Sequence, residues 1–148
     1  MKRKLAWAAL LVYSAVMLWL LLGQRIGQNA EAQLQLQPLE TVLRFWRVLR
    51  DSNDSESLLH AWSNLAGNVV LFVPLGFVVP WMWQPWRRFW RHILLMGGII
   101  LAVELSQLLL ALGTCDVDDL LLNLLGTSLG FLLWQLVQRI KTETNPST

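Results

Sequence analysis

Sulfur, imidazole and charge are all scarce in this chain of 148 residues. There is one cysteine, Cys115, and there are two histidines, His60 and His92. A single cysteine excludes an internal disulfide, and two distant histidines do not form a zinc motif. Charged residues make up 15% of the chain, against about 25% in ordinary soluble domains. The sequence therefore lacks both the cysteines and histidines of a zinc site and the usual surface of a soluble enzyme, and we expect no metal, cofactor or catalytic residue.

Apolar residues, in contrast, make up 55% of the chain and are gathered into blocks. Four blocks carry few or no charges, and they cover residues 5–22, 65–83, 93–112 and 120–137. Each is close to the roughly 20 residues that a helix needs to cross about 30 Å of hydrocarbon. Single segments cross lipid only as helices, because lipid offers no partner for open backbone groups. The sequence predicts an all-α integral membrane four-helix bundle.

The basic residues predict the orientation of the four spans. Eight of the twelve lie before the first block, between the second and third, and after the fourth: Lys2, Arg3, Lys4, Arg87, Arg88, Arg91, Arg139 and Lys141. Positive residues favour the cytoplasmic side, so both termini are predicted to be cytoplasmic in a multi-pass protein of the cell membrane. The alternative for residues 1–32 is a cleavable signal peptide ending near Ala32.

The longest segment between two blocks covers residues 23–61. Residues 23–37 are predicted to be a loop, residues 39–50 an amphipathic helix and residues 51–57 a turn. Arg44, Arg47 and Arg50 are spaced by three and therefore share one face of that helix. Two interpretations stay open: the helix lies in the outer membrane interface with its arginines towards lipid phosphates, or it packs over the bundle ends with a solvated basic face. Residues 1–141 are predicted to form a single domain and residues 142–148 a short disordered tail.

Polar residues inside a membrane are costly and need a reason. They come in pairs that share a helix face, and we expect them at a similar depth in the outer half of the membrane. The candidate ligand-binding residues are Asn64, Asn68, Glu104, Gln107, Asp116, Asp119 and Asn123. The alternative for the asparagines is hydrogen bonding between helices. Glu104 is the strongest candidate, because no lysine or arginine in any block can pair with it; the alternative is a protonated structural carboxyl.

Two further patterns lie near the fourth block. Gly126 and Gly130 form a small-xxx-small pair, and Gly67, Gly97 and Gly98 are also expected to allow close helix packing. The acidic run Asp116, Asp118 and Asp119 could bind a cation, but Asp119 could equally cap the helix that follows. We expect no metal site there, although the sequence leaves the cation question open.

These motifs resemble those of the VanZ-like family of small membrane proteins. The first is Asn64-x3-Asn68 followed by Leu71-Phe72-x-Pro74-Leu75-Gly76-Phe77, and the second is Glu104-x-x-Gln107. The third is Asp116-x-Asp118-Asp119-x3-Asn123-x-x-Gly126-x3-Gly130, and a weaker element is Gln35-Leu36-x-Pro38. The matches span residues 35–131. One difference is that many members have an arginine shortly before the acidic run, where this chain has Gly113-Thr114-Cys115.

The resemblance implies a protein of the cell envelope that acts at the outer leaflet. The family is named for an accessory protein that raises resistance to teicoplanin, a lipid-tailed glycopeptide. The first hypothesis is therefore binding of a lipid headgroup or lipid-tailed amphiphile. The expected partners are membrane lipids, lipid-linked cell-wall intermediates and lipoglycopeptides. No nucleic acid is expected, and a homo-oligomer is left open. The alternatives are a membrane assembly factor or oligomeric transporter, and an intramembrane lipid hydrolase that uses carboxylates. Histidine pairs and arginines are absent from the blocks, which disfavours the hydrolase.

Overall fold

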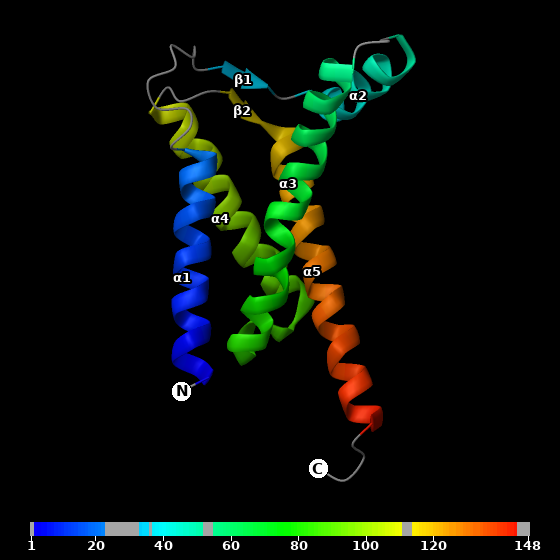
Figure 1. Ribbon diagram of the computed structural model, residues 1–148. Helices are drawn as coiled ribbons and strands as arrows, with labels where there is room; N and C mark the ends of the chain where they lie inside the picture. Colours follow the sequence, from blue (N-terminus) through cyan, green and yellow to red (C-terminus); the bar gives the residue numbers. More distant parts are fainter. Residues whose placement is uncertain (1, 23–32, 36, 52–54, 111–113, 145–148) are drawn as a thin grey trace. The chain divides into compact units, whose positions relative to one another are not determined.

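The computed structural model describes residues 2–22, 33–35, 37–51, 55–110 and 114–144. Its helices are α1 (Lys2–Leu21), α2 (Glu40–Asp51), α3 (Ser55–Met82), α4 (Phe89–Leu109) and α5 (Val117–Thr144), with a short 3-10 helix, η2 (Gln84–Arg87) (Figure 1). Two short strands are β1 (Gln33–Gln35) and β2 (Thr114–Asp116). Four of the helices, α1, α3, α4 and α5, are long and apolar enough to cross a membrane. The predicted all-α fold with four spans and an additional helix is confirmed.

The described chain forms two compact units, which are considered separately. One consists of Met1–Gln35 and Leu101–Asp116, and the other of Leu36–Ile100 and Val117–Thr148. The first holds α1, the strands and the last part of α4; the second holds α2, α3, η2, the first part of α4 and α5. The prediction of a single domain over residues 1–141 remains a prediction.

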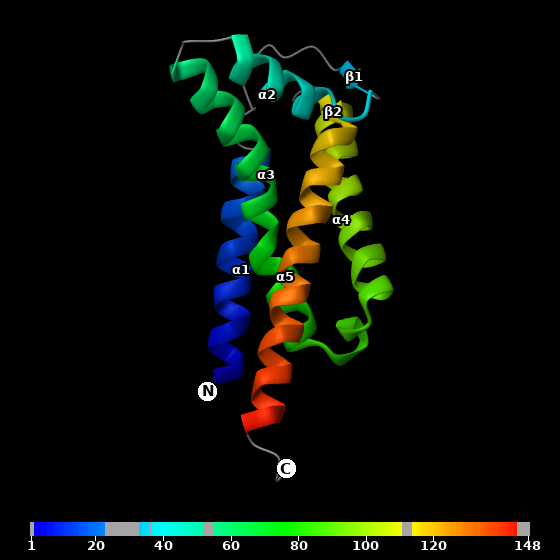
Figure 2. The ribbon, with the colours of Figure 1, turned by 90° about the vertical axis from the view of Figure 1, so that its right-hand side faces the viewer.

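The second unit is built on the pairing of α3 with α5. The two helices lie side by side in both views (Figures 1 and 2). A methyl group at Gly126 would lie 2.1 Å from the carbonyl oxygen of Val69, and methyl groups at Gly130 and Gly76 would meet backbone equally closely. These glycines therefore let the two backbones touch, as predicted for Gly126 and Gly130. Phe72 and Phe131, which are fully buried, fill the core of this unit.

Other glycines do not have the predicted role. Gly67 and Gly98 have no heavy atom of another part of the described chain within 4 Å of the position that a methyl group would take, so neither marks a close approach. Gly97 is in ordinary contact with the Leu124 side chain at 3.7 Å. Glycine spacing alone does not say which face of a helix meets a neighbour.

Helix α2 runs crosswise to α3 and α5, at one end of that pair (Figure 2). Its buried residue is Phe45, whose ring packs edge-on against Trp62 of α3 at a centroid distance of 4.9 Å. The predicted helix over residues 39–50 is confirmed within one residue at each end.

Several predicted boundaries are wrong. Gln33–Gln35, predicted as loop, is a strand that pairs in parallel with Thr114–Asp116, so Leu34 lies opposite Cys115. Ser55–Ser57, predicted as a turn, begins α3, and Thr142–Thr144, predicted as disordered tail, ends α5. Strand pairing and helix extension depend on partners distant in sequence, which local composition does not reveal. The rest of the predicted tail, residues 145–148, lies outside the described residues.

Candidate functional site

The carboxylate of Asp118 holds the beginning of α2. The backbone N–H of Leu39 donates to its Oδ1, and the N–H of Thr41 donates to its Oδ2, each at 2.6 Å. Asp118 is only 2% exposed, and it belongs to the first turn of α5. The first N–H groups of a helix lack intrahelical acceptors and carry partial positive charge, so an anion there is favoured. One side chain from α5 thus performs for α2 the capping role that a residue of α2 itself usually performs.

Leu39 needs this support because its backbone is strained. Its φ is +68°, in the left-handed region, which leucine rarely adopts. Such a conformation costs on the order of 1–3 kcal/mol and persists only where surrounding contacts hold it. The bond from Leu39 N–H to Asp118 is one such contact. The entry into α2 is therefore fixed by a tertiary interaction.

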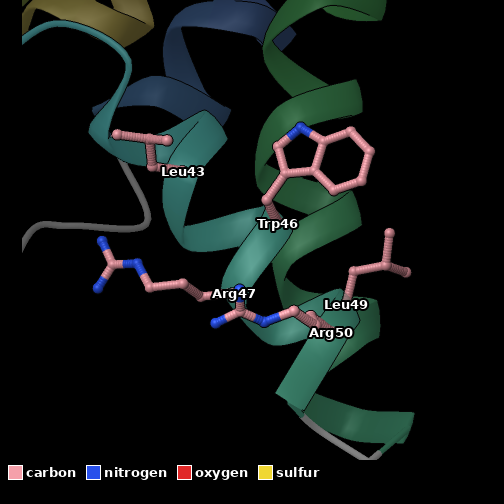
Figure 3. Close-up of a pocket in the computed structure, with 5 residues that line it drawn as sticks. All are labelled: Leu43, Trp46, Arg47, Leu49 and Arg50. Atoms are coloured by element: carbon pink, nitrogen blue, oxygen red, sulfur yellow. The ribbon is translucent and has the colours of Figure 1, made fainter.

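The exposed face of α2 combines apolar and basic side chains. Leu43, Trp46 and Leu49 are 55%, 60% and 46% exposed. Together with Arg47 and Arg50 they line a groove of about 560 Å³ (Figure 3). In an interfacial helix such a face places apolar side chains among acyl chains and basic groups among lipid phosphates. Of the two interpretations of α2 left open by the sequence, the exposed tryptophan and leucines favour the interfacial one.

Two of the predicted ligand-binding residues meet in the second unit. The side-chain N–H of Asn68 donates to Oδ1 of Asp119 at 2.5 Å, and this bond ties α3 to the first turn of α5. Since α5 begins at Val117, Asp119 lies inside the helix and not at the capping position expected for it. Asn123, one turn further along, is 2% exposed, and its Oδ1 has no hydrogen-bond partner among the described residues.

The other described candidates lie in the first unit. The backbone N–H of Asp116 donates to Oε2 of Glu104 at 3.3 Å, and Nε2 of Gln107 donates to the carbonyl oxygen of Leu21 at 3.0 Å. Glu104 and Gln107 are both buried, as expected for polar side chains in a span. The half-buried thiol of Cys115 has a pKa raised by burial and by the negative charges of Glu104 and Asp116. Glu104 and Gln107 therefore help to join α4 to β2 and α1.

The predicted pocket is described only in its parts. Asn68 and Asp119 form one hydrogen-bonded pair, whereas Glu104, Gln107 and Asp116 belong to the other unit. Asn64 lies in α3, but its side chain is outside the described part of the chain. Convergence of all seven residues on one ligand remains a prediction. Among the residues that the structure describes, no group of three or more acidic, histidine or cysteine side chains could hold a metal ion.

Sequence reasoning missed a buried polar cluster near the start of α4. His92 is fully buried, and its Nε2 lies 2.9 Å from Oγ1 of Thr127 on α5. Its ring packs on Phe131 at a centroid distance of 5.0 Å. Nδ1 of His92 and Nε1 of Trp134 have no partner within the described ranges. The expectation that buried polar residues lie at one end only of the spans is wrong. The signal was present: a histidine directly before the third apolar block, and a threonine within the fourth.

A protein-family model described as VanZ/LLP1 matches residues 6–138. The chain belongs to the VanZ/LLP1 family. The match takes in all four membrane-spanning helices and the crosswise helix α2, so this is a multi-pass membrane protein of that family. No curated protein and no solved structure matches the chain. Within this VanZ/LLP1 protein, the acidic run resembling the third family motif is the place where α2, α3 and α5 are joined.

Proposed function

We propose that this VanZ/LLP1 protein binds a lipid headgroup or a lipid-tailed amphiphile at the outer leaflet of the cell membrane. The observation that carries the proposal is the exposed face of α2, where Leu43, Trp46 and Leu49 stand beside Arg47 and Arg50. An amphiphile has the same two parts, an apolar chain and a polar head. Burial of half-exposed leucine and tryptophan against such a chain is favourable by about 25 cal/mol per Å².

The orientation belongs to the same proposal. The distribution of basic residues favours cytoplasmic termini, which puts α2 and the acidic run on the outer side. Lipid-linked cell-wall intermediates and lipoglycopeptides are available at that surface. Binding of teicoplanin there is the route by which this protein would affect the susceptibility of the cell to that antibiotic.

The seven polar candidates have a subordinate place in this proposal. Asn68, Asp119, Glu104 and Gln107 are engaged in hydrogen bonds within the chain, which supports a role in joining helices. Asn123 is the candidate best suited to meet a ligand, because its buried Oδ1 has no acceptor role within the described chain. Gly126 and Gly130 are occupied by contacts between α3 and α5, so this glycine pair gives no specific support to the oligomeric transporter.

Binding of teicoplanin to the full chain in lipid nanodiscs tests the proposal. The comparison is between the antibiotic and its deacylated form, and between the wild type and Trp46→Ala/Leu49→Ala. We expect the deacylated form to bind at least tenfold more weakly, and the double variant to lose about tenfold for the acylated form alone. The control is Leu59→Ala, an exposed leucine of α3 outside the groove. Equal binding of both forms would contradict the proposal.

A further inference from the structure

The groove beside α2 divides its chemistry between two sides. Its lining residues are Leu43, Trp46, Arg47, Leu49 and Arg50. Figure 3 shows the Arg47 and Arg50 side chains extending towards one side of α2 and those of Trp46 and Leu49 towards the other. A ligand that fills the groove therefore meets two guanidinium groups and the Leu43 side chain at one edge, and an indole and an isobutyl group at the opposite edge. Such an arrangement selects a molecule with an anionic head and an apolar body.

The arginines of α2 are not equivalent. Arg44 lies outside the groove lining, and its Nη2 is 3.6 Å from Oε1 of Glu40, one turn earlier. Arg47 makes no hydrogen bond or ion pair with any residue in the described part of the chain. Arg47 and Arg50 are three residues apart, which places their Cβ atoms about 5–6 Å from each other on one helix face. Both line the groove, so they can approach one anion together, whereas Arg44 lies outside it.

The chemistry of the two groups identifies the anion. All the cationic side chains of α2 are arginines, whose planar forks bind phosphate oxygens in pairs. A phosphate ester offers several acceptor oxygens, enough for two forks, and a phosphate monoester carries about −1.5 to −2 charges at pH 7. A lipid phosphate also lies at the depth where an interfacial helix sits, with its acyl chains directed below. Free phosphate offers the same oxygens but nothing for Trp46 and Leu49.

We infer that the α2 groove is a site for a lipid headgroup with a net negative phosphate, with Arg47 and Arg50 holding the phosphate and Trp46 and Leu49 packing against the acyl chain. This inference rests on the proposed binding of amphiphiles at the same face, and it adds the chemical class of the head. Lipid-linked intermediates that carry a phosphate would then bind in preference to zwitterionic bulk lipid. The preference weakens as ionic strength rises, because exposed charges are screened by salt.

The experiment uses the full chain in nanodiscs of phosphatidylcholine. Fluorescent phosphatidic acid, fluorescent phosphatidylcholine and fluorescent diacylglycerol of equal chain length are titrated separately, and inorganic phosphate is added as a competitor. We expect phosphatidic acid to bind at least tenfold more tightly than either of the other two lipids. Arg47→Gln/Arg50→Gln should remove that preference and leave binding of phosphatidylcholine and diacylglycerol within about twofold of wild type.

Two matched variants isolate the cause. Arg44→Gln removes one positive charge from the same helix outside the groove and should leave the preference within about twofold. Arg47→Lys/Arg50→Lys keeps both charges without the forks and should retain part of the preference. The circular dichroism of each variant reports that the helices are retained, which is expected because the substituted side chains are exposed.

The outcomes separate this inference from the proposal on which it rests. If the three lipids bind equally and teicoplanin still requires its acyl chain, the site binds amphiphiles without preferring an anionic phosphate headgroup, and the inference is overturned alone. If no lipid binds and deacylation of teicoplanin has no effect, the proposed function is overturned as well. If inorganic phosphate displaces phosphatidic acid at equal concentration, the acyl chain contributes nothing and the lipid headgroup is the wrong source.

Discussion

Three neighbouring acids make separate connections at the start of α5. Asp118 accepts two N–H groups from the beginning of α2, and Asp119 accepts the side-chain amide of Asn68. Asp116 contributes its own backbone N–H to Glu104. The side chains of Asp118 and Asp119 bind different helices. A substitution at either residue should therefore weaken one specific contact. From the sequence alone they are a single acidic run, for which cation binding and helix capping were the two interpretations.

Replacing Asp118 should loosen α2 without unfolding the spans. Asp118→Ala removes both acceptors at once, and a hydrogen bond to a charged group contributes about 1.5–3 kcal/mol. We expect amide hydrogen exchange at Leu39 and Thr41 to accelerate by at least tenfold. Asp119→Ala is the control, since its partner Asn68 is on α3 and not on α2. Equal acceleration in both variants would mean that α2 is not held by Asp118 in particular.

A second prediction at this scale concerns the buried pair of His92 and Thr127. Thr127→Val keeps the shape of the side chain but removes the hydroxyl that lies 2.9 Å from Nε2 of His92. A buried polar group left without its partner costs about 1–3 kcal/mol, so the melting temperature in detergent should fall by several degrees. In Ser128→Ala the lost bond goes only to the carbonyl of Leu124 in the same helix, and the change should be close to neutral. A stable Thr127→Val protein would show that the pair contributes nothing.

At the scale of the elements, the α3–α5 contact depends on the absence of side chains. A methyl group at Gly126 would lie 2.1 Å from the carbonyl oxygen of Val69. That oxygen belongs to the backbone of α3 and cannot turn aside, so the helices would have to separate. Separation would also weaken the packing of the fully buried Phe72 and Phe131. The pairing therefore tolerates no larger residue at Gly126.

Gly126→Ala should consequently destabilise the protein by at least about 1–3 kcal/mol, the usual range of overpacking. Thermal unfolding in detergent, followed by loss of the monodisperse peak in size-exclusion chromatography, measures the effect. Gly98→Ala is the matched control, because the methyl group there meets nothing within 4 Å in the described structure. Its stability should be unchanged or slightly higher, as alanine favours helix over glycine. A neutral Gly126→Ala would place the α3–α5 contact elsewhere.

At the scale of the whole molecule, Cys115 reports which side of the membrane the acidic run occupies. It is the only cysteine of the chain, so labelling has a single target. We expect a membrane-impermeant maleimide added to intact cells to label it, because the distribution of basic residues predicts this end outside. Labelling that requires opened cells would reverse the orientation. The control is Cys115→Ser, which should show no labelling at all.

The same thiol gives a prediction about pH. Its pKa is raised by burial and by the charges of Glu104 and Asp116, so less thiolate is present at neutral pH than in an unperturbed cysteine. Labelling should be slow at pH 7 and accelerate as the pH rises. Glu104→Gln removes a negative charge, lowers the pKa of the thiol and should increase the rate at fixed pH. Ser106→Ala, on α4 in the same unit, removes no charge and is the control; it should have no effect.

Much of the fold was open to prediction because it depends on composition over long windows. A membrane span is recognised by about 20 apolar residues, and an interfacial helix by its repeating basic positions, so the four spans and α2 were predicted. The spacing of Gly126 and Gly130 predicted a close helix contact. Burial of Glu104 and Gln107 was predictable because polar groups are costly in lipid.

Only the tertiary structure decided which residue meets which. Capping of α2 by Asp118 joins positions 77 and 79 residues apart, and the strand pairing joins Leu34 to Cys115. The same local sequence allows a carboxylate at a helix start to cap its own helix or a neighbouring one. Which helix it caps depends on how the elements pack. The bond between His92 and Thr127 was hidden for the same reason. Composition and period thus determined the elements, whereas the contacts that give α2 its place arose from packing across long separations in the chain.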